Sequence, residues 1–112
     1  MLILPIKKKW FDMIASGEKQ EEYREIKPYW DKRFRKVFLY ARLSEYSDSP
    51  TLPYGSDEHE VIFRNGYSKN STSFIAKCTL SIGKGREEWG AEPGKEYFRI
   101  HIKEIQNGSS LL

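Results

Sequence analysis

The stretch from Gly17 to Glu25 follows a helical pattern and is predicted to be a strand with charged side chains on both faces. Alternate residues of a strand point to opposite faces. One face would carry Lys19, Glu21, Tyr23 and Glu25, and the other Gln20, Glu22, Arg24 and Ile26. Burying such charges without partners costs several kcal/mol each. The strand must therefore be a solvated edge strand, or line a polar cleft in which its charged side chains pair.

A spaced motif lies inside this stretch. Gly17, Lys19, Glu22 and Arg24 spell G-x-K-x-x-E-x-R, directly after a short predicted helix near the N-terminus. The motif resembles the signature of the ASCH domain, a relative of the PUA fold, and the order of strand, helix, motif strand and further strands is similar too. The resemblance covers essentially the whole chain and implies a PUA-like β-barrel. It favours the cleft interpretation of the charged strand.

Hydrophobic periodicity predicts a small α+β barrel of about six strands, with one main helix after the first strand. The helix is expected to begin near Pro5 and to end at Gly17, a left-handed cap. A short helical turn is expected at Pro28. The remaining strands are expected at residues 2–4, 36–42, 60–64, 73–82 and 97–105, with a long loop at 43–58. The pattern alone is also compatible with an OB-like or SH3-like barrel.

The length of 112 residues suits one domain, predicted over residues 1–106, with a flexible tail at 107–112. The net charge of +3 permits a polyanionic partner without requiring one. The single cysteine, Cys78, falls on the apolar face of its strand and is expected in the core. One cysteine, no signal-peptide pattern and no apolar run of membrane-spanning length together favour a cytoplasmic protein. No cofactor is expected, and two separated histidines do not favour a metal site.

The resemblance to ASCH domains implies that the partner is RNA or a nucleotide. Lys19 and Arg24 would supply phosphate or base contacts, because Arg offers a planar fork of donors and Lys a point charge. Glu22 would accept from a base amino group or hold the arginine in place. Tyr29 and Trp30 lie among basic residues and are candidates for stacking on a base. Because alternation places Lys19 opposite Glu22, a common cleft requires a bend or bulge near residue 20.

A small hydrolase acting on RNA or a modified nucleoside is the alternative. Some ASCH-like proteins are amidohydrolases that deacetylate cytidine acetylated on its exocyclic amine, using a lysine, a threonine nucleophile and a glutamate. Here Glu22 stands where those proteins have the threonine, so Lys19 and Glu22 would form an acid/base pair, with Glu87 or Glu88 as a second carboxylate. A ribonuclease would need a similar constellation. A third interpretation is a charged interaction adaptor that binds no nucleic acid.

Overall fold

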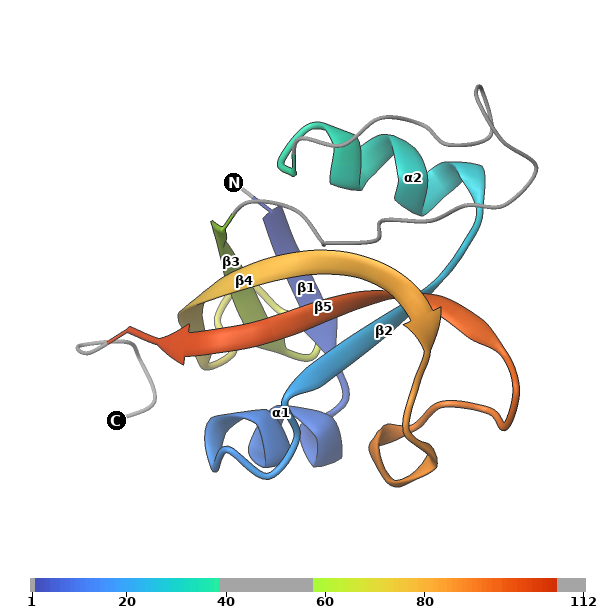
Figure 1. Ribbon diagram of the computed structural model, residues 1–112. Helices are drawn as coiled ribbons and strands as arrows, with labels where there is room; N and C mark the ends of the chain where they lie inside the picture. Colours follow the sequence, from blue (N-terminus) through green and yellow to red (C-terminus); the bar gives the residue numbers. More distant parts are fainter. Residues whose placement is uncertain (1, 39–57, 107–112) are drawn as a thin grey trace.

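The computed structural model describes residues 2–38 and 58–106, which form an α+β fold with two helices and a curled five-stranded mixed sheet. The first helix follows the first strand, as predicted (Figure 1). The described residues form a half-barrel of five strands, where a barrel of about six strands was expected. The elements in chain order are β1 (Leu2–Ile6), α1 (Lys8–Ala15), β2 (Glu21–Glu25), α2 (Pro28–Arg35), β3 (His59–Asn65), β4 (Ser73–Lys84), the 3-10 turn η2 (Glu87–Trp89) and β5 (Glu96–Ile105).

The sheet order is β1-β3-β4-β5-β2, so the first two strands of the chain are the two edges of the sheet. β1 pairs with β3 in parallel, and the other neighbours pair in antiparallel fashion. β2 pairs with β5 with Glu22 opposite Ile100 and Tyr23 opposite Arg99. Directly opposed residues share a face. Glu22 therefore lies on the same face as the core residue Ile100, whereas Tyr23 and Arg99 lie on the outer face.

The first helix begins later than the sequence predicts. Pro5 lies in β1 instead of opening the helix. A proline is tolerated there because β1 is an edge strand, where a missing N–H need not remove a ladder hydrogen bond. The other end is as predicted: Gly17 adopts a positive φ of 86° and its N–H donates to the Ile14 carbonyl.

The expected strand at 36–42 is wrong in its first residues. Pro28 opens a helix of eight residues, and Lys36 to Phe38 form the turn that ends it; residues 39–42 and most of the 43–58 loop lie outside the described residues. Trp30, Phe34 and Phe38 recur every four residues, which is helical spacing. These three side chains pack on the core when the segment is helical, and this packing decides the structure over the strand-like alternation that starts at Val37. The structure thus has two helices where one main helix was expected.

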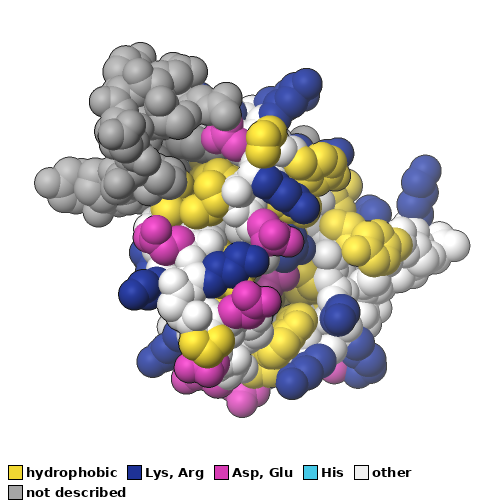
Figure 2. Space-filling model, turned by 90° about the vertical axis from the view of Figure 1, so that its right-hand side faces the viewer, with side chains coloured by type: hydrophobic (Ala, Val, Ile, Leu, Met, Phe, Trp, Pro, Cys, Tyr) yellow, Lys and Arg dark blue, Asp and Glu magenta, His cyan; other side chains and the backbone are white. Residues whose placement is uncertain are grey.

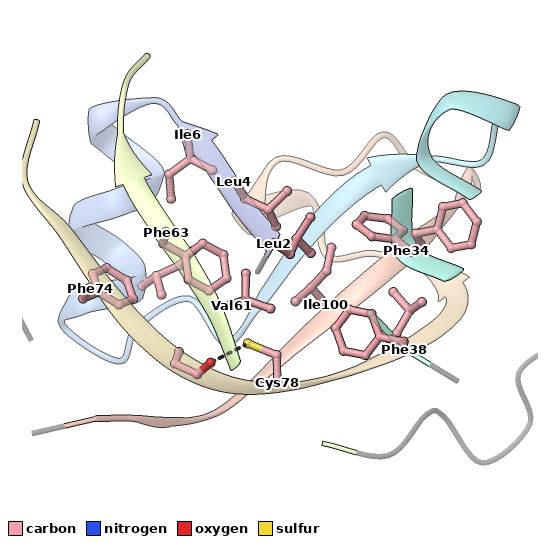
Figure 3. Packing of buried hydrophobic residues seen from close by; sticks show 14 of the residues in the cluster. Leu2, Leu4, Ile6, Phe34, Phe38, Val61, Phe63, Phe74, Cys78 and Ile100 are labelled. Carbon is pink, nitrogen blue, oxygen red and sulfur yellow. Dashed lines mark hydrogen bonds between the residues drawn. The ribbon is translucent and has the colours of Figure 1, made fainter. Parts of the chain in front are cut away.

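The core fills the concave side of the curled sheet (Figure 3). Alternate residues of β4 point inward as predicted, and Cys78 is fully buried among them. Phe34 and Phe38 pack over the same core from the α2 side (Figure 3). Burial raises the pKa of the Cys78 thiol to about 12, which suits a core residue and not a nucleophile. In the part of the chain that the structure describes, neither helix is long and apolar enough to cross a membrane.

Candidate functional site

The charged residues of the motif form one continuous chain of ion pairs. Nζ of Lys19 lies 3.1 Å from Oε1 of Glu22, and Oε2 of Glu22 lies 2.6 Å from an Nη atom of Arg24. Only 1% of the Lys19 side chain and 7% of the Glu22 side chain are exposed to solvent, against 16% of the Arg24 side chain. The chain is therefore largely removed from solvent, with Arg24 at its more accessible end.

The turn between α1 and β2 brings Lys19 to Glu22. The Lys19 N–H donates to the Met13 carbonyl at 2.9 Å, so this residue is tied to the last turn of α1. β2 begins at Glu21, and strand alternation does not apply to Lys19. From the turn just before β2, the Lys19 ammonium therefore lies within 3.1 Å of the Glu22 carboxylate.

Aromatic rings surround the Lys19 ammonium. Nζ lies 4.6 Å from the ring centre of Trp10 and 5.0 Å from that of Tyr23, and it donates to the backbone carbonyl of Trp89. Burial lowers the pKa of Lys19 below its usual range; Glu22 acts in the opposite direction, and the positive charge of Arg24 lowers the pKa further. The cation–π contacts and the carboxylate compensate for part of the desolvation.

Arg24 joins three elements. Its guanidinium donates to Glu22, to the Tyr23 carbonyl at 2.8 Å and to the Pro5 carbonyl at 3.1 Å. Pro5 lies in the opposite edge strand of the sheet, so Arg24 links the two edges across the open side of the half-barrel. The guanidinium carbon also lies 5.2 Å from the ring centre of Trp30 in α2.

Of the two candidate stacking residues, Trp30 lies beside this arginine, whereas Tyr29 lies against Trp30 and next to Arg33. Tyr29 packs edge-on against Trp30 with ring centres 4.8 Å apart, and 53% of Tyr29 is exposed. The Arg33 guanidinium lies 4.4 Å from the Tyr29 ring centre. Tyr29, Lys32, Arg33 and Lys36 line a surface hollow of about 500 Å³ together with Leu2 and Val37. An exposed aromatic ring and three cations thus meet at one surface.

The remaining predicted residues are not part of this site. Glu87 and Glu88 are exposed on η2, and neither forms an ion pair with Lys19 within residues 2–38 and 58–106. The same turn instead contributes the Trp89 carbonyl, a contact that the sequence analysis missed. The sequence feature that points to this contact is the dipeptide Trp89-Gly90. Gly90 has a φ of 100°, and a Cβ there would lie 3.0 Å from the Trp10 ring. Only glycine lets Trp10 pack so closely against the turn.

Charges of both signs are mixed on the face of the molecule drawn in Figure 2. Figure 2 shows Lys and Arg side chains interspersed with Asp and Glu side chains and with apolar patches, not merged into one basic surface. Within the described residues no group of three or more His, Cys, Asp or Glu side chains is placed to hold a metal ion. No protein-family model, curated protein or solved structure matches the chain.

Proposed function

We propose that this chain is an ASCH-like domain of the PUA type that binds RNA or a nucleotide through Arg24 and the exposed aromatic surface of α2. The observation that carries the proposal is the position of Arg24: Glu22 holds its guanidinium beside Trp30, next to the exposed Tyr29. The curled half-barrel is compatible with a PUA-like barrel, and the motif residues that carry the resemblance form one ion-paired chain.

Within this proposal the buried residues position the arginine and do not touch the ligand. Lys19 and Glu22 are too deeply buried for direct contact, but together they fix the orientation of Arg24. The hydrogen bonds of Arg24 leave its Nε–H without an acceptor among the described residues. A planar guanidinium with a free donor can bind a phosphate oxygen or a base edge.

The hollow on α2 supplies the other contacts that single-stranded nucleic acid requires. Proteins of this kind combine aromatic rings, on which bases stack, with cations that follow the phosphates. Tyr29 offers the ring, and Lys32, Arg33 and Lys36 offer the charges. Because stacking tolerates every base, the proposed surface binds RNA with little sequence preference.

Binding of a fluorescent single-stranded RNA oligonucleotide tests the proposal. We expect Tyr29→Ala to weaken binding by about 1–3 kcal/mol through lost stacking. Affinity should also fall steeply between low and high salt as counterions are released. Tyr67→Ala is the matched control, since Tyr67 is 87% exposed and lies away from α2 in the β3–β4 connection. Absence of wild-type binding, or equal losses for the two tyrosine variants, contradicts the proposal.

A hydrolase built on Lys19 and Glu22 is the second candidate, favoured by the lowered pKa of Lys19. It requires the substrate to displace the contacts that bury both side chains in this structure. A lysine with a depressed pKa is better suited to proton transfer at neutral pH. Glu22 has no hydroxyl for acyl transfer, so deacetylation of N4-acetylcytidine by the wild type should be weak, and Glu22→Thr should increase it. The measurement is chromatographic release of cytidine. Robust turnover by the wild type that Glu22→Thr abolishes would make Glu22 itself the catalytic residue.

A further inference from the structure

A second polar network lies on the outer face of the sheet, opposite the core. Nδ1 of His101 lies 3.0 Å from Oε2 of Glu21, and Nε2 of the same ring lies 2.6 Å from Oγ of Ser81. The three residues come from neighbouring strands, β2, β5 and β4. We propose that Ser81, His101 and Glu21 form a nucleophile–base–carboxylate triad that hydrolyses small anionic esters.

The hydrogen bonds define the role of each member. A glutamate next to Nδ1 requires the proton on that nitrogen, which leaves Nε2 as an acceptor for the Ser81 hydroxyl. His101 is therefore oriented as a general base toward Ser81, and Glu21 is a positioning residue. A serine, a histidine and a carboxylate in this order are recognised as a triad by geometry and not by sequence position.

Glu21 is itself fixed from the side away from His101. Its Oε1 accepts from the Tyr23 hydroxyl at 2.7 Å, and the Tyr23 oxygen accepts from the Arg86 N–H at 2.9 Å. Partial burial alone would raise the pKa of Glu21, but the hydrogen bonds from His101 and Tyr23 outweigh it and the pKa lies below its usual range. The carboxylate is thus ionised at neutral pH and able to stabilise an imidazolium.

Arg99 supplies positive charge next to the nucleophile. Its Nε donates to Ser81 Oγ at 3.1 Å, and one Nη donates to the Lys84 carbonyl at 3.2 Å. The guanidinium lies against Gly83, where a Cβ would be 2.6 Å from its central carbon. A charged donor in this position favours the oxyanion that develops when Ser81 attacks a carbonyl.

The surroundings of the triad select the class of substrate. Glu21, His101 and Arg99 line a hollow of about 390 Å³, to which Lys84, Arg86 and Lys103 also contribute. Ser81 is 7% exposed to solvent, and its two hydrogen-bond partners, His101 and Arg99, line this hollow. The volume suits a small molecule and the cations suit a carboxylate or phosphate on it.

The proposed reaction is acyl transfer to serine followed by hydrolysis. Ser81 Oγ bonds to the ester carbon while its proton passes to His101 Nε2; the C–O bond to the leaving group then breaks, and the leaving alkoxide takes that proton. A water molecule attacks the acyl-serine, gives its proton to His101, and the Oγ–C bond breaks. The proton returns to Oγ, which releases the carboxylic acid and restores the triad.

Covalent labelling of the wild-type protein tests the proposal without depending on a variant that folds. Diisopropyl fluorophosphate should add one diisopropylphosphoryl group, and peptide mass spectrometry should locate it on Ser81. Ser73→Ala, on the same strand, should label like the wild type, whereas Ser81→Ala and His101→Ala should not label. A folded wild type that stays unlabelled, or that labels elsewhere, overturns the triad and leaves a purely structural network.

Steady-state hydrolysis then tests substrate class and the role of Glu21. The 4-nitrophenyl monoester of succinate should exceed 4-nitrophenyl acetate in kcat/KM by about tenfold or more, since the two differ by a carboxylate that the cations can bind. Glu21→Gln should lower kcat by about 10²–10⁴-fold with a smaller change in KM, and Glu21→Asp should restore part of it. Equal hydrolysis of both esters overturns the anionic preference, and an unchanged kcat in Glu21→Gln overturns the positioning role.

Discussion

Nζ of Lys19 and Oε1 of Glu22 lie 3.1 Å apart, and no more than 7% of either side chain is exposed to solvent. Such a pair is not strongly stabilising overall, because two desolvation penalties offset the attraction between the charges. Each partner nevertheless depends on the other. Removing Glu22 leaves a buried ammonium that Arg24 repels, and the attraction of the remaining carboxylate, Glu21, is smaller than that repulsion.

We therefore expect Glu22→Gln to lower the free energy of unfolding by about 3–5 kcal/mol at neutral pH, because it leaves the Lys19 charge uncompensated. The measurement is urea unfolding followed by circular dichroism. Asp12→Asn is the matched control: it removes an exposed ion pair with Lys8, and such pairs contribute about 1 kcal/mol or less. Similar losses for the two variants would show that the buried pair has no special role in stability.

The second prediction concerns the pH dependence of that loss. Burial depresses the pKa of Lys19 in the folded protein, and loss of Glu22 removes a group that raises this pKa. Below the folded pKa, lysine is charged in both states and the variant carries the full penalty. As pH rises through the folded pKa, the native state releases its proton before the unfolded state does, so native stability increases. The difference between wild type and Glu22→Gln should shrink from pH 7 to pH 10, and a constant difference would count against a buried charged lysine.

How far sequence predicts this structure depends on how local each signal is. The strand from Ser73 was predictable because apolar residues alternate along it and one face is buried. The helical turn at Pro28 was predicted, but the length of α2 was not. Trp30, Phe34 and Phe38 recur at helical spacing, and the strand-like alternation after Lys36 obscured that signal. The motif predicted that Lys19, Glu22 and Arg24 belong together. It could not predict their burial, which depends on Trp10 and on the distant turn at Trp89.

The network of Ser81, His101 and Glu21 on the outer face could not be predicted from the sequence, for a related reason. Reading β5 by alternation does place His101 on the face away from the core. Its partners are set by register: Glu21 is opposite His101, and Ser81 is opposite Arg99. A shift of one residue between β2 and β5 would separate Glu21 from His101, and a shift between β4 and β5 would separate Ser81 from His101. No short-range signal in the chain specifies either register.

The third prediction uses Cys78. Burial raises the pKa of this thiol from about 9 to about 12. Between these values the unfolded chain loses the thiol proton and the native state keeps it, so stability falls as pH rises. Relative to Cys78→Ala, the wild type should lose about 1.4 kcal/mol per pH unit above pH 9. Urea unfolding of both proteins at pH 8, 9 and 10 measures this, and parallel curves would contradict the burial of the thiol. Tyr23 titrates in both proteins and cancels from the difference.

The last prediction compares two glycines at the end of β4. A Cβ at Gly85 would lie 2.6 Å from the Ala91 Cβ and 2.7 Å from the Tyr23 ring, and both of these groups are packed in the second apolar cluster. Gly85→Ala should therefore cost about 1–3 kcal/mol of stability through overpacking. The three atoms nearest to a Cβ at Gly83 all belong to the guanidinium end of the flexible Arg99 side chain.

Gly83→Ala should consequently be much less destabilising than Gly85→Ala, but it should move the Arg99 guanidinium away from Ser81. If Arg99 stabilises the developing oxyanion, Gly83→Ala slows ester hydrolysis and fluorophosphate labelling while the melting temperature stays near that of the wild type. Unchanged labelling in a stable Gly83→Ala protein would assign Arg99 to the sheet surface alone. A melting temperature as low as that of Gly85→Ala would instead show that Arg99 cannot move, because its bonds to Ser81 and the Lys84 carbonyl hold it in place.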